Sequence, residues 1–271
     1  PTRRFADVWE YYKFKDFVHI LDAPRTISDL AYEVYESQVR GLKRHLEEHF
    51  KVQITDEKLQ DAIDVYNKGR ALLKRIHELR KQDVPPISGA ETMEILNASR
   101  RMPPQQFNEM MERLLQELAA SKREVKGKYR ILLNGSPLNN ADYIKAIENL
   151  GGLVVMDELC TGVRYWWESV DKGSDPIKAI SRRYLHNFAC PRMCPSDDRF
   201  ERVLKLTRDY RIDAVITGIV RHCMSWAHEQ PLLRRRLEDA GIPVLELDLE
   251  YSMPATGQIL TRVQAFLEML Q

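Results

Sequence analysis

Apolar residues recur every three or four positions along most of the first half of the chain, which is the spacing of one face of an α-helix. Thr55, followed by Asp56 and Glu57, is typical of a helix start, because a side-chain oxygen and acidic groups suit the exposed amides there. Pro85 and Pro86 would end that helix, since proline disfavours the helical conformation before it. The pattern predicts helices over residues 26–50, from 55 to the two prolines, from 88 onward and over 103–121, with a short strand over 17–21.

The pattern changes at Lys128, where short apolar runs begin to alternate with helical segments. Such alternation predicts a parallel sheet with helices on both faces. We therefore expect an α/β fold: a parallel four-stranded, flavodoxin-like sheet with flanking helices, preceded by a mainly helical segment. Residues 1–127 would complete an N-terminal domain, and residues 128–271 would form the α/β domain. The predicted strands cover residues 129–133, 153–156, 214–220 and 242–247, and the predicted helices cover 141–150, a region reaching 184, 200–210, 231–240 and 258–270.

Charge and hydropathy exclude several classes of partner. The 41 basic and 40 acidic residues are well mixed and leave a net charge of +1, so the sequence predicts no nucleic-acid surface. No apolar run approaches the roughly 18 residues of a membrane span, and no signal peptide precedes the first charged residues. We therefore expect a cytoplasmic protein. The chain begins abruptly at Pro1 without a methionine, and we expect it to be a piece of a longer protein.

The four cysteines all lie in the second half of the chain, at positions 160, 190, 194 and 223. In a reducing compartment, clustered cysteines serve metal or redox chemistry more often than disulfides, although each could also be a small buried hydrophobic residue. Cys160 follows the second predicted strand, and Cys223 follows the third. Because ligands of parallel sheets bind beyond the carboxyl ends of the strands, these two thiols are expected at one ligand-binding edge.

Two nucleotide-binding motifs are missing from the sequence. The turn after the first predicted strand, Asn134-Gly135-Ser136-Pro137, lacks the Gly-x-Gly-x-x-Gly spacing of a dinucleotide site. The Gly-x-x-x-x-Gly-Lys-Ser/Thr motif is also absent, so the chain is not expected to hydrolyse ATP itself.

Several segments, in order and spacing, resemble the 2-hydroxyacyl-CoA dehydratase and benzoyl-CoA reductase family. The segments are Leu21-Asp22-Ala23-Pro24-Arg25, Asp157 to Tyr165, Ala189-Cys190-Pro191, Ile216 to Cys223, Gly241 to Leu245 and Thr261 to Phe266. The resemblance implies an iron–sulfur enzyme subunit with a [4Fe–4S] cluster, commonly held by three cysteines. It also implies an acyl-CoA substrate, a paralogous partner subunit in a heterodimer, and a separate ATP-dependent iron–sulfur activator. The reaction would be radical dehydration of a 2-hydroxyacyl-CoA or reduction of the benzoyl-CoA ring.

The resemblance also assigns roles to particular residues. Cys223 matches the family's Arg-x-Cys position and is the first candidate for a cluster ligand, ahead of Cys160 and Cys190. Arg164 and Arg221 lie near these cysteines in the sequence, and they could neutralise a cluster or bind CoA phosphates, because guanidinium matches phosphate geometry. Cys190 also forms a Cys-x-x-x-Cys pair with the cysteine at 194, which suits a metal only with further ligands. Asp157 and Glu158 offer a possible general base, and the catalytic residues are otherwise unknown.

The sequence departs from the family at its beginning. The family's early cysteines, including one in a Cys-Asp pair shortly before the Asp-x-Pro segment, have no counterpart here. We expect the chain to lack the N-terminal domain that carries them, and therefore to assemble a cluster poorly when alone, since a cluster needs several converging thiolates. Two alternatives stay open: a related reductase with a double-cubane cluster, or a cluster-free scaffold that supports a paralogous catalytic subunit.

Overall fold

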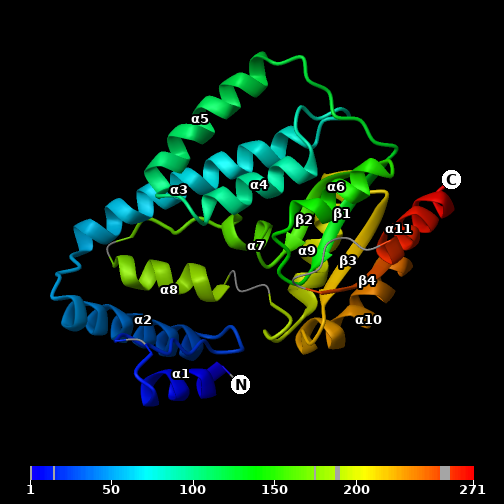
Figure 1. Cartoon of the computed structure of the whole chain (residues 1–271). Helices are drawn as coiled ribbons and strands as arrows, with labels where there is room; N and C mark the ends of the chain where they lie inside the picture. Colours follow the sequence, from blue (N-terminus) through cyan, green and yellow to red (C-terminus); the bar gives the residue numbers. More distant parts are fainter. Residues whose placement is uncertain (1, 15, 174, 187–189, 251–256) are drawn as a thin grey trace. The chain divides into compact units, whose positions relative to one another are not determined.

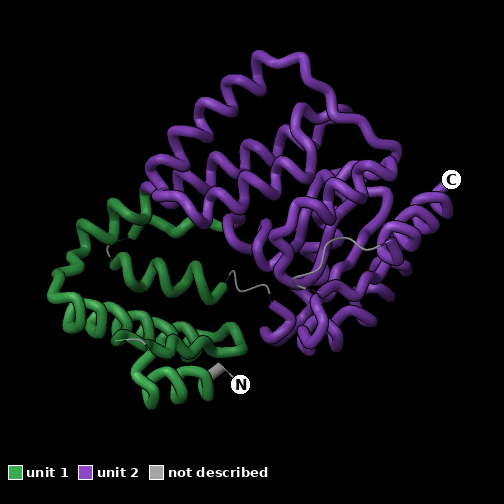
Figure 2. The backbone as a smooth tube through the Cα atoms, viewed as in Figure 1, with its two compact units in different colours: residues 1–64, 168–188 green, residues 65–167, 189–271 purple. Residues whose placement is uncertain are grey.

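A computed structural model describes residues 2–14, 16–173, 175–186, 190–250 and 257–271. Ala189 of the Ala-Cys-Pro segment lies outside these residues. The chain forms two compact units: residues 1–64 with 168–188, and residues 65–167 with 189–271 (Figure 2). These units follow from contacts in space, whereas the predicted boundary at Lys128 follows from a change in sequence pattern. The predicted division into domains therefore stays a prediction.

The second unit contains one sheet of four parallel strands, in the order β2-β1-β3-β4 (Figure 1). This sheet confirms the predicted α/β fold, and its strand order begins as in flavodoxin-like folds. The first two strands lie side by side, and β3 pairs with the other side of β1, so the order reverses between β1 and β3. The strands are β1 (Tyr129–Gly135), β2 (Gly152–Leu159), β3 (Ala214–Val220) and β4 (Val244–Leu249).

Three of the four strands differ from their predicted bounds: β1 runs to 135 and not to 133, β4 covers 244–249 and not 242–247, and β2 is longer than expected. The second strand was expected to end at residue 156, but β2 continues to Leu159, so Asp157 and Glu158 are buried strand residues and not loop residues. Burial is tolerated because both carboxylates have polar partners, described below. The segment 17–21, predicted as a strand, is irregular, and none of the strands among the described residues pairs with it to satisfy its backbone groups.

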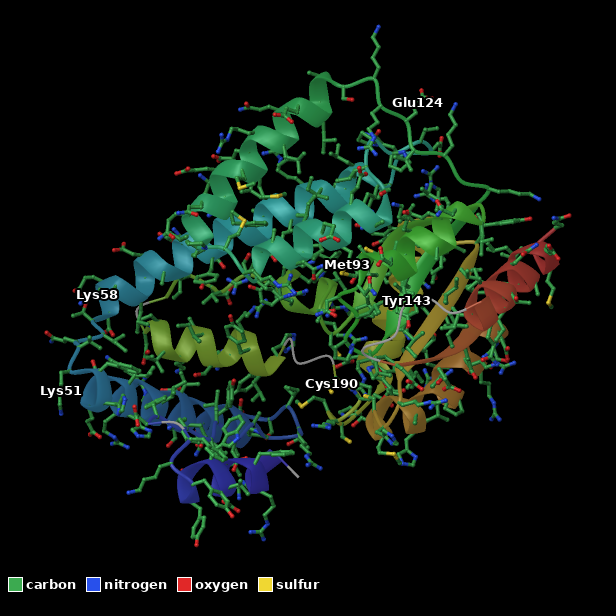
Figure 3. The ribbon with its side chains drawn as sticks, in the orientation of Figure 1. Lys51, Lys58, Met93, Glu124, Tyr143 and Cys190 are labelled. Atoms are coloured by element: carbon green, nitrogen blue, oxygen red, sulfur yellow. The ribbon has the colours of Figure 1, made fainter. Side chains whose placement is uncertain are left out.

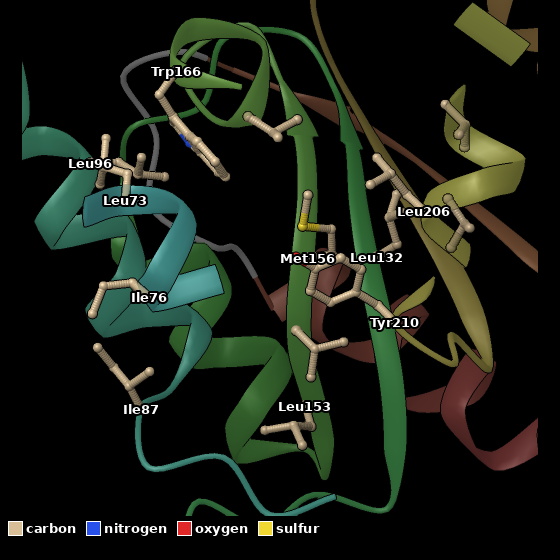
Figure 4. Packing of buried hydrophobic residues seen from close by; sticks show 14 of the residues in the cluster. Leu73, Ile76, Ile87, Leu96, Leu132, Leu153, Met156, Trp166, Leu206 and Tyr210 are labelled. Carbon is tan, nitrogen blue, oxygen red and sulfur yellow. The ribbon is translucent and has the colours of Figure 1, made fainter. Parts of the chain in front are cut away.

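Helices cover both faces of the sheet. Leu132 of β1 and Val215 of β3 face a cluster that includes side chains of α3, α5, α9 and α10. The alternate residues Ile131 and Ile216 face α6 and α11. Figure 4 shows part of the first cluster, with Leu73 and Ile76 of α3 beside the sheet. The helices with residues in this unit are α3 (Asp56–Leu79, from residue 65), α4 (Gly89–Ser99), α5 (Pro104–Ala120), α6 (Ala141–Asn149), α7 (Val163–Trp166), α9 (Asp197–Asp209), α10 (Met224–Asp239) and α11 (Gly257–Met269).

The first unit is helical in the part of the chain that the structure describes. It contains α1 (Thr2–Tyr11), which the sequence pattern missed, α2 (Asp29–Phe50) and α8 (Pro176–His186), besides the start of α3. Helix α2 packs along α8, and the Arg40 guanidinium on α2 bonds both Glu36 and Asp175. None of the helices described is long and apolar enough to cross a membrane.

The start of α4 is fixed by a reciprocal cap, which gives a first stability prediction. The Ser88 hydroxyl accepts a hydrogen bond from Glu91 N (3.1 Å), and the Glu91 carboxylate accepts one from Ser88 N (2.9 Å). Replacing Ser88 with alanine should lower the free energy of unfolding by about 1 kcal/mol, the usual effect of losing such a cap. Urea unfolding followed by circular dichroism measures this loss, and an unchanged midpoint would show that the cap contributes nothing.

Candidate functional site

The candidate site lies at the carboxyl edge of the sheet, where the strand order reverses between β1 and β3. At this edge β1 and β3 approach closely through two glycines, Gly135 and Gly218, which are paired in the sheet register. Ser136 N continues the contact by donating to Gly218 O (3.0 Å). Ligands of open parallel sheets bind in the crevice outside such a reversal, so the loops after β1, β2 and β3 form the expected ligand-binding edge.

Cys160 and Arg164 form the centre of this edge. Cys160 directly follows β2, as the sequence predicted, and it is partly buried. The Arg164 guanidinium donates through Nη1 to Cys160 Sγ (3.1 Å) and through Nη2 to Gly135 O (3.1 Å). The same guanidinium lies 4.7 Å from the ring centroid of Trp226 on α10. Residues from β1, from the turn after β2 and from α10 therefore meet around the buried positive charge of Arg164.

Glu158 fixes Arg164 from the other side. Its carboxylate lies 3.0 Å from Arg164 Nε and 3.5 Å from Arg202 Nε, and its side chain is only 4% exposed. The sequence suggested Glu158 as a general base at the end of a strand. Its position inside β2, between two guanidinium groups, instead suits an ion-pair partner that holds Arg164 against Cys160. Arg202 was missed, because nothing in its local sequence distinguishes it from a surface arginine.

Two further thiols lie near Cys160. Burial raises the pKa of the Cys160 thiol; the charge of Arg164 opposes this rise, and Cys190 and Cys223 add to it. Cys190 comes from the loop before α9 (Figure 3), and Cys223 is the N-cap residue directly before α10. The fold therefore places Cys190 and Cys223 within electrostatic reach of Cys160, although 63 residues separate Cys160 from Cys223 in the sequence (223 − 160 = 63).

A buried ion pair anchors the loop that carries Cys190. Arg199 on α9 donates through Nε to Glu229 on α10 (2.9 Å) and through Nη1 to Met193 O (2.8 Å). Both charged side chains are 9% exposed. Met193 N in turn donates to Cys190 O (2.9 Å), so the ion pair reaches the cysteine loop through its backbone.

Two other sequence candidates are exposed. The Cys194 residue is exposed, and it is not among the causes that shift the pKa of Cys160. The Arg221 side chain is 65% exposed and pairs with Glu250 (2.6 Å), just beyond the ends of β3 and β4. Arg164 and Arg221 thus differ in kind: one is a buried partner of a thiol, and the other is a surface cation at the same edge of the sheet.

Asp157 and His77 form a second buried group behind the cysteine turn. The Asp157 carboxylate accepts hydrogen bonds from Val163 N (2.8 Å) and Leu159 N (3.4 Å), and its other oxygen lies 3.5 Å from His77 Nε2. Burial lowers the pKa of His77 more than Asp157 raises it, so the ring is neutral at neutral pH. Burial raises the pKa of Asp157, but the nearby His77 ring, the hydrogen bond from the Val163 amide and the Arg80 charge together lower it.

The donor set fits a thiolate-held cluster in its chemistry. Three thiols supply the soft ligands that iron–sulfur clusters take, and Arg164 supplies a positive neighbour for their negative charge. Across the described residues, no group of three or more His, Cys, Asp or Glu side chains is arranged so that it could hold a metal ion. The described residues therefore match a cluster in the type of their ligands but do not form a complete metal site, and Arg164 lies against the sulfur of Cys160.

Comparison with known proteins extends these observations. The chain matches the family described as 2-hydroxyglutaryl-CoA dehydratase, D-component, over residues 2–270. It is 28% identical, over 97% of its length, to a protein of Escherichia coli (strain K12) proposed as a dehydratase subunit. It is 24% identical, over 90% of its length, to one of the subunits of benzoyl-CoA reductase from Thauera aromatica. It is 25% identical, over 88% of its length, to the beta subunit of (R)-2-hydroxyglutaryl-CoA dehydratase from Acidaminococcus fermentans.

The chain spans 70%, 64% and 63% of the lengths of these three relatives. The family match covers almost every residue of the chain, including the helical first half and all four strands. It confirms the resemblance that the cysteine and arginine segments predicted. The chain therefore belongs to the 2-hydroxyglutaryl-CoA dehydratase D-component family of enzyme subunits.

Proposed function

We propose that this chain is part of a subunit of an iron–sulfur enzyme that acts on acyl-CoA thioesters, either by dehydrating a 2-hydroxyacyl-CoA or by reducing benzoyl-CoA. The observation that carries the proposal is the contact of Arg164 with Cys160 at the ligand-binding edge of the sheet, with Cys190 and Cys223 close enough to Cys160 to affect its pKa. The membership of the chain in the 2-hydroxyglutaryl-CoA dehydratase D-component family supports this interpretation of the cysteines.

In this proposal Cys160, Cys190 and Cys223 hold a [4Fe–4S] cluster. The bound cluster would supply one-electron chemistry, for which the protein provides ligands, charge and exclusion of water. Arg164 supports this role because its guanidinium already lies against a thiol and is held there by Glu158. A buried positive charge stabilises negative thiolates, so it favours the ligand form of these cysteines.

Arg221 is the proposed contact for a CoA phosphate. Its pairing with Glu250 is a surface ion pair, and such pairs contribute little free energy, so a phosphate group can replace the carboxylate. Guanidinium matches phosphate geometry with two parallel hydrogen bonds. The position of Arg221 beyond β3 would place the nucleotide end of the substrate at the rim of the same edge.

The proposal includes partners and a location. The relatives from Thauera aromatica and Acidaminococcus fermentans are each named as one subunit of an enzyme, which supports pairing with a paralogous subunit. An ATP-dependent iron–sulfur activator would deliver the electron, because the sequence lacks a motif for hydrolysing ATP. The expected location is the cytoplasm.

Iron binding tests the proposal directly. Reconstituted anaerobically with ferrous iron and sulfide, in its natural full length and together with its partner subunit, the protein should be brown and contain roughly four irons per chain, as a cubane cluster requires. The Cys223→Ser variant should lose most of this iron, because an alcohol is a poor ligand for the cluster. Iron analysis and the visible absorption spectrum measure both results.

The exposed cysteine provides the matched control. Cys194→Ser should keep the wild-type iron content, because this residue is exposed and is not among the groups that shift the pKa of Cys160. A Cys223→Ser protein that keeps all its iron would refute the ligand assignment. A colourless, iron-free wild type, tested together with its partner subunit, would refute the cluster and favour the scaffold alternative.

A further inference from the structure

We infer that Asp157 is a positioning residue for the turn that carries Cys160 and Arg164, and that it acts together with His77 on α3. Nothing in the sequence pattern indicates such a role, since it depends on two residues 80 positions apart (157 − 77 = 80). The inference concerns the same edge as the proposed function, but it requires neither a cluster nor a substrate.

The first argument is the way in which Asp157 closes the turn. Its Oδ1 accepts hydrogen bonds from Leu159 N and from Val163 N, the first residue of α7. The two amides lie on either side of the loop that contains Cys160. A β-carbon at Gly162 would lie 1.5 Å from Asp157 Oδ1, so the turn can fold over the carboxylate only with glycine at that position.

The second argument is that both ends of the turn meet the same histidine. His77 Nε2 lies 3.5 Å from Oδ2 of Asp157, which precedes the turn. The ring centroids of His77 and Trp166, which follows the turn, are 4.3 Å apart. His77 is itself completely buried, and its Nδ1 lies 3.0 Å from Leu73 O of the preceding helical turn. Helix α3 therefore provides a fixed support for both ends.

The middle of the turn has a separate attachment. The Thr161 hydroxyl donates to Leu138 O (2.5 Å) and accepts from Leu138 N (3.2 Å), and Arg100 bonds Thr161 O. These contacts tie the turn to the loop after β1 and to the end of α4. Removing Asp157 would therefore release the ends of the turn, where Cys160 and Arg164 lie, while its centre stays attached.

The consequence for the site is geometric. Arg164 reaches Cys160 Sγ only because the chain reverses between them within four residues, and Asp157 sets that reversal. A positioning role predicts that loss of the carboxylate exposes the Cys160 thiol, whereas a merely stabilising role predicts a lower melting temperature and no selective change at Cys160.

Alkylation of the metal-free, reduced protein by iodoacetamide distinguishes these two roles, with peptide mass spectrometry reporting each cysteine separately. In Asp157→Ala, alkylation of Cys160 should become faster by about fivefold relative to the exposed Cys194 in the same molecule, because access limits the reaction of a partly buried thiol. Asp157→Asn keeps an oxygen that can accept from Val163 N, so it should restore the rate ratio to within about twofold of the wild type.

Glu148→Ala is the matched control, because Glu148, although only part-buried, is also a carboxylate that accepts hydrogen bonds from two backbone amides, those of Gly89 (2.7 Å) and Ala90 (3.2 Å). It should lower the melting temperature and leave the ratio of Cys160 to Cys194 alkylation unchanged. An unchanged ratio in Asp157→Ala, or an equal change in Glu148→Ala, would overturn the inference. Neither result depends on iron, so failure here is distinguishable from failure of the proposed function.

Discussion

Replacing Gly135 with alanine should lower the free energy of unfolding by about 4 kcal/mol or more, which puts it among the most damaging single substitutions. Gly135 ends β1 with a φ of +131°, a backbone conformation that residues other than glycine rarely adopt. A β-carbon there would lie 2.0 Å from the backbone oxygen of Gly218. That oxygen cannot move without separating β1 from β3, and the two strands are paired through five register positions.

Thermal unfolding followed by circular dichroism measures this loss, which corresponds to a fall in melting temperature of about 10 °C for a chain of this size. Gly151→Ala separates the two causes, because Gly151 also has a positive φ (+98°), while a β-carbon there meets no atom within 4 Å. The Gly151 variant should lose only about 1–2 kcal/mol, the cost of the left-handed conformation alone. Equal losses in the two variants would show that the contact between β1 and β3 is not the cause.

Arg199→Met should destabilise the protein by about 3–5 kcal/mol, because it leaves the Glu229 carboxylate buried without its charge partner. The same substitution removes the hydrogen bond to Met193 O that fixes the loop of Cys190. Urea unfolding of Arg199→Met, of Glu229→Leu and of the double variant measures the coupling. The double variant should recover a large part of the loss, since replacing both charges with apolar groups leaves no unpaired buried ion.

An exposed pair gives the reference for this experiment. Arg234 and Glu238 lie one helical turn apart on α10, with side chains 48% and 46% exposed. Arg234→Met should change the free energy of unfolding by less than about 0.5 kcal/mol, as surface ion pairs do. If Arg199→Met changed stability no more than Arg234→Met, the buried pair would not anchor the α9–α10 region.

The strands and helices of the second unit could be predicted from local patterns, because the formation of each one depends mainly on residues that are neighbours in the sequence. The strand at 214–220 was predicted with the bounds that the structure has, and the short apolar runs located the other three. Errors arose where tertiary partners override local character. The charges of Asp157 and Glu158 favour a loop, whereas His77 and Arg164 allow both residues to be buried in β2.

The candidate site was predicted only in part. The rule that ligands bind beyond the carboxyl ends of parallel strands predicts Cys160 and Cys223 at one edge from the sequence alone. The proximity of Cys190 could not be predicted in this way, because it comes from a loop whose path depends on Arg199 and Glu229. The support from His77 was also hidden, since one buried histidine in a helix carries no local signal.

By itself, the sequence determined the alternation of strands and helices, the edge that carries two of the cysteines, and the family to which the chain belongs. These depend on periodicity and on short segments, which the sequence displays directly. Only the tertiary structure decided which polar groups are buried together: Arg164 against Cys160 and Glu158, and His77 against Asp157. The physical reason is that a buried charge or hydrogen-bonding group needs a partner in space, and packing alone brings such partners together from distant parts of the chain.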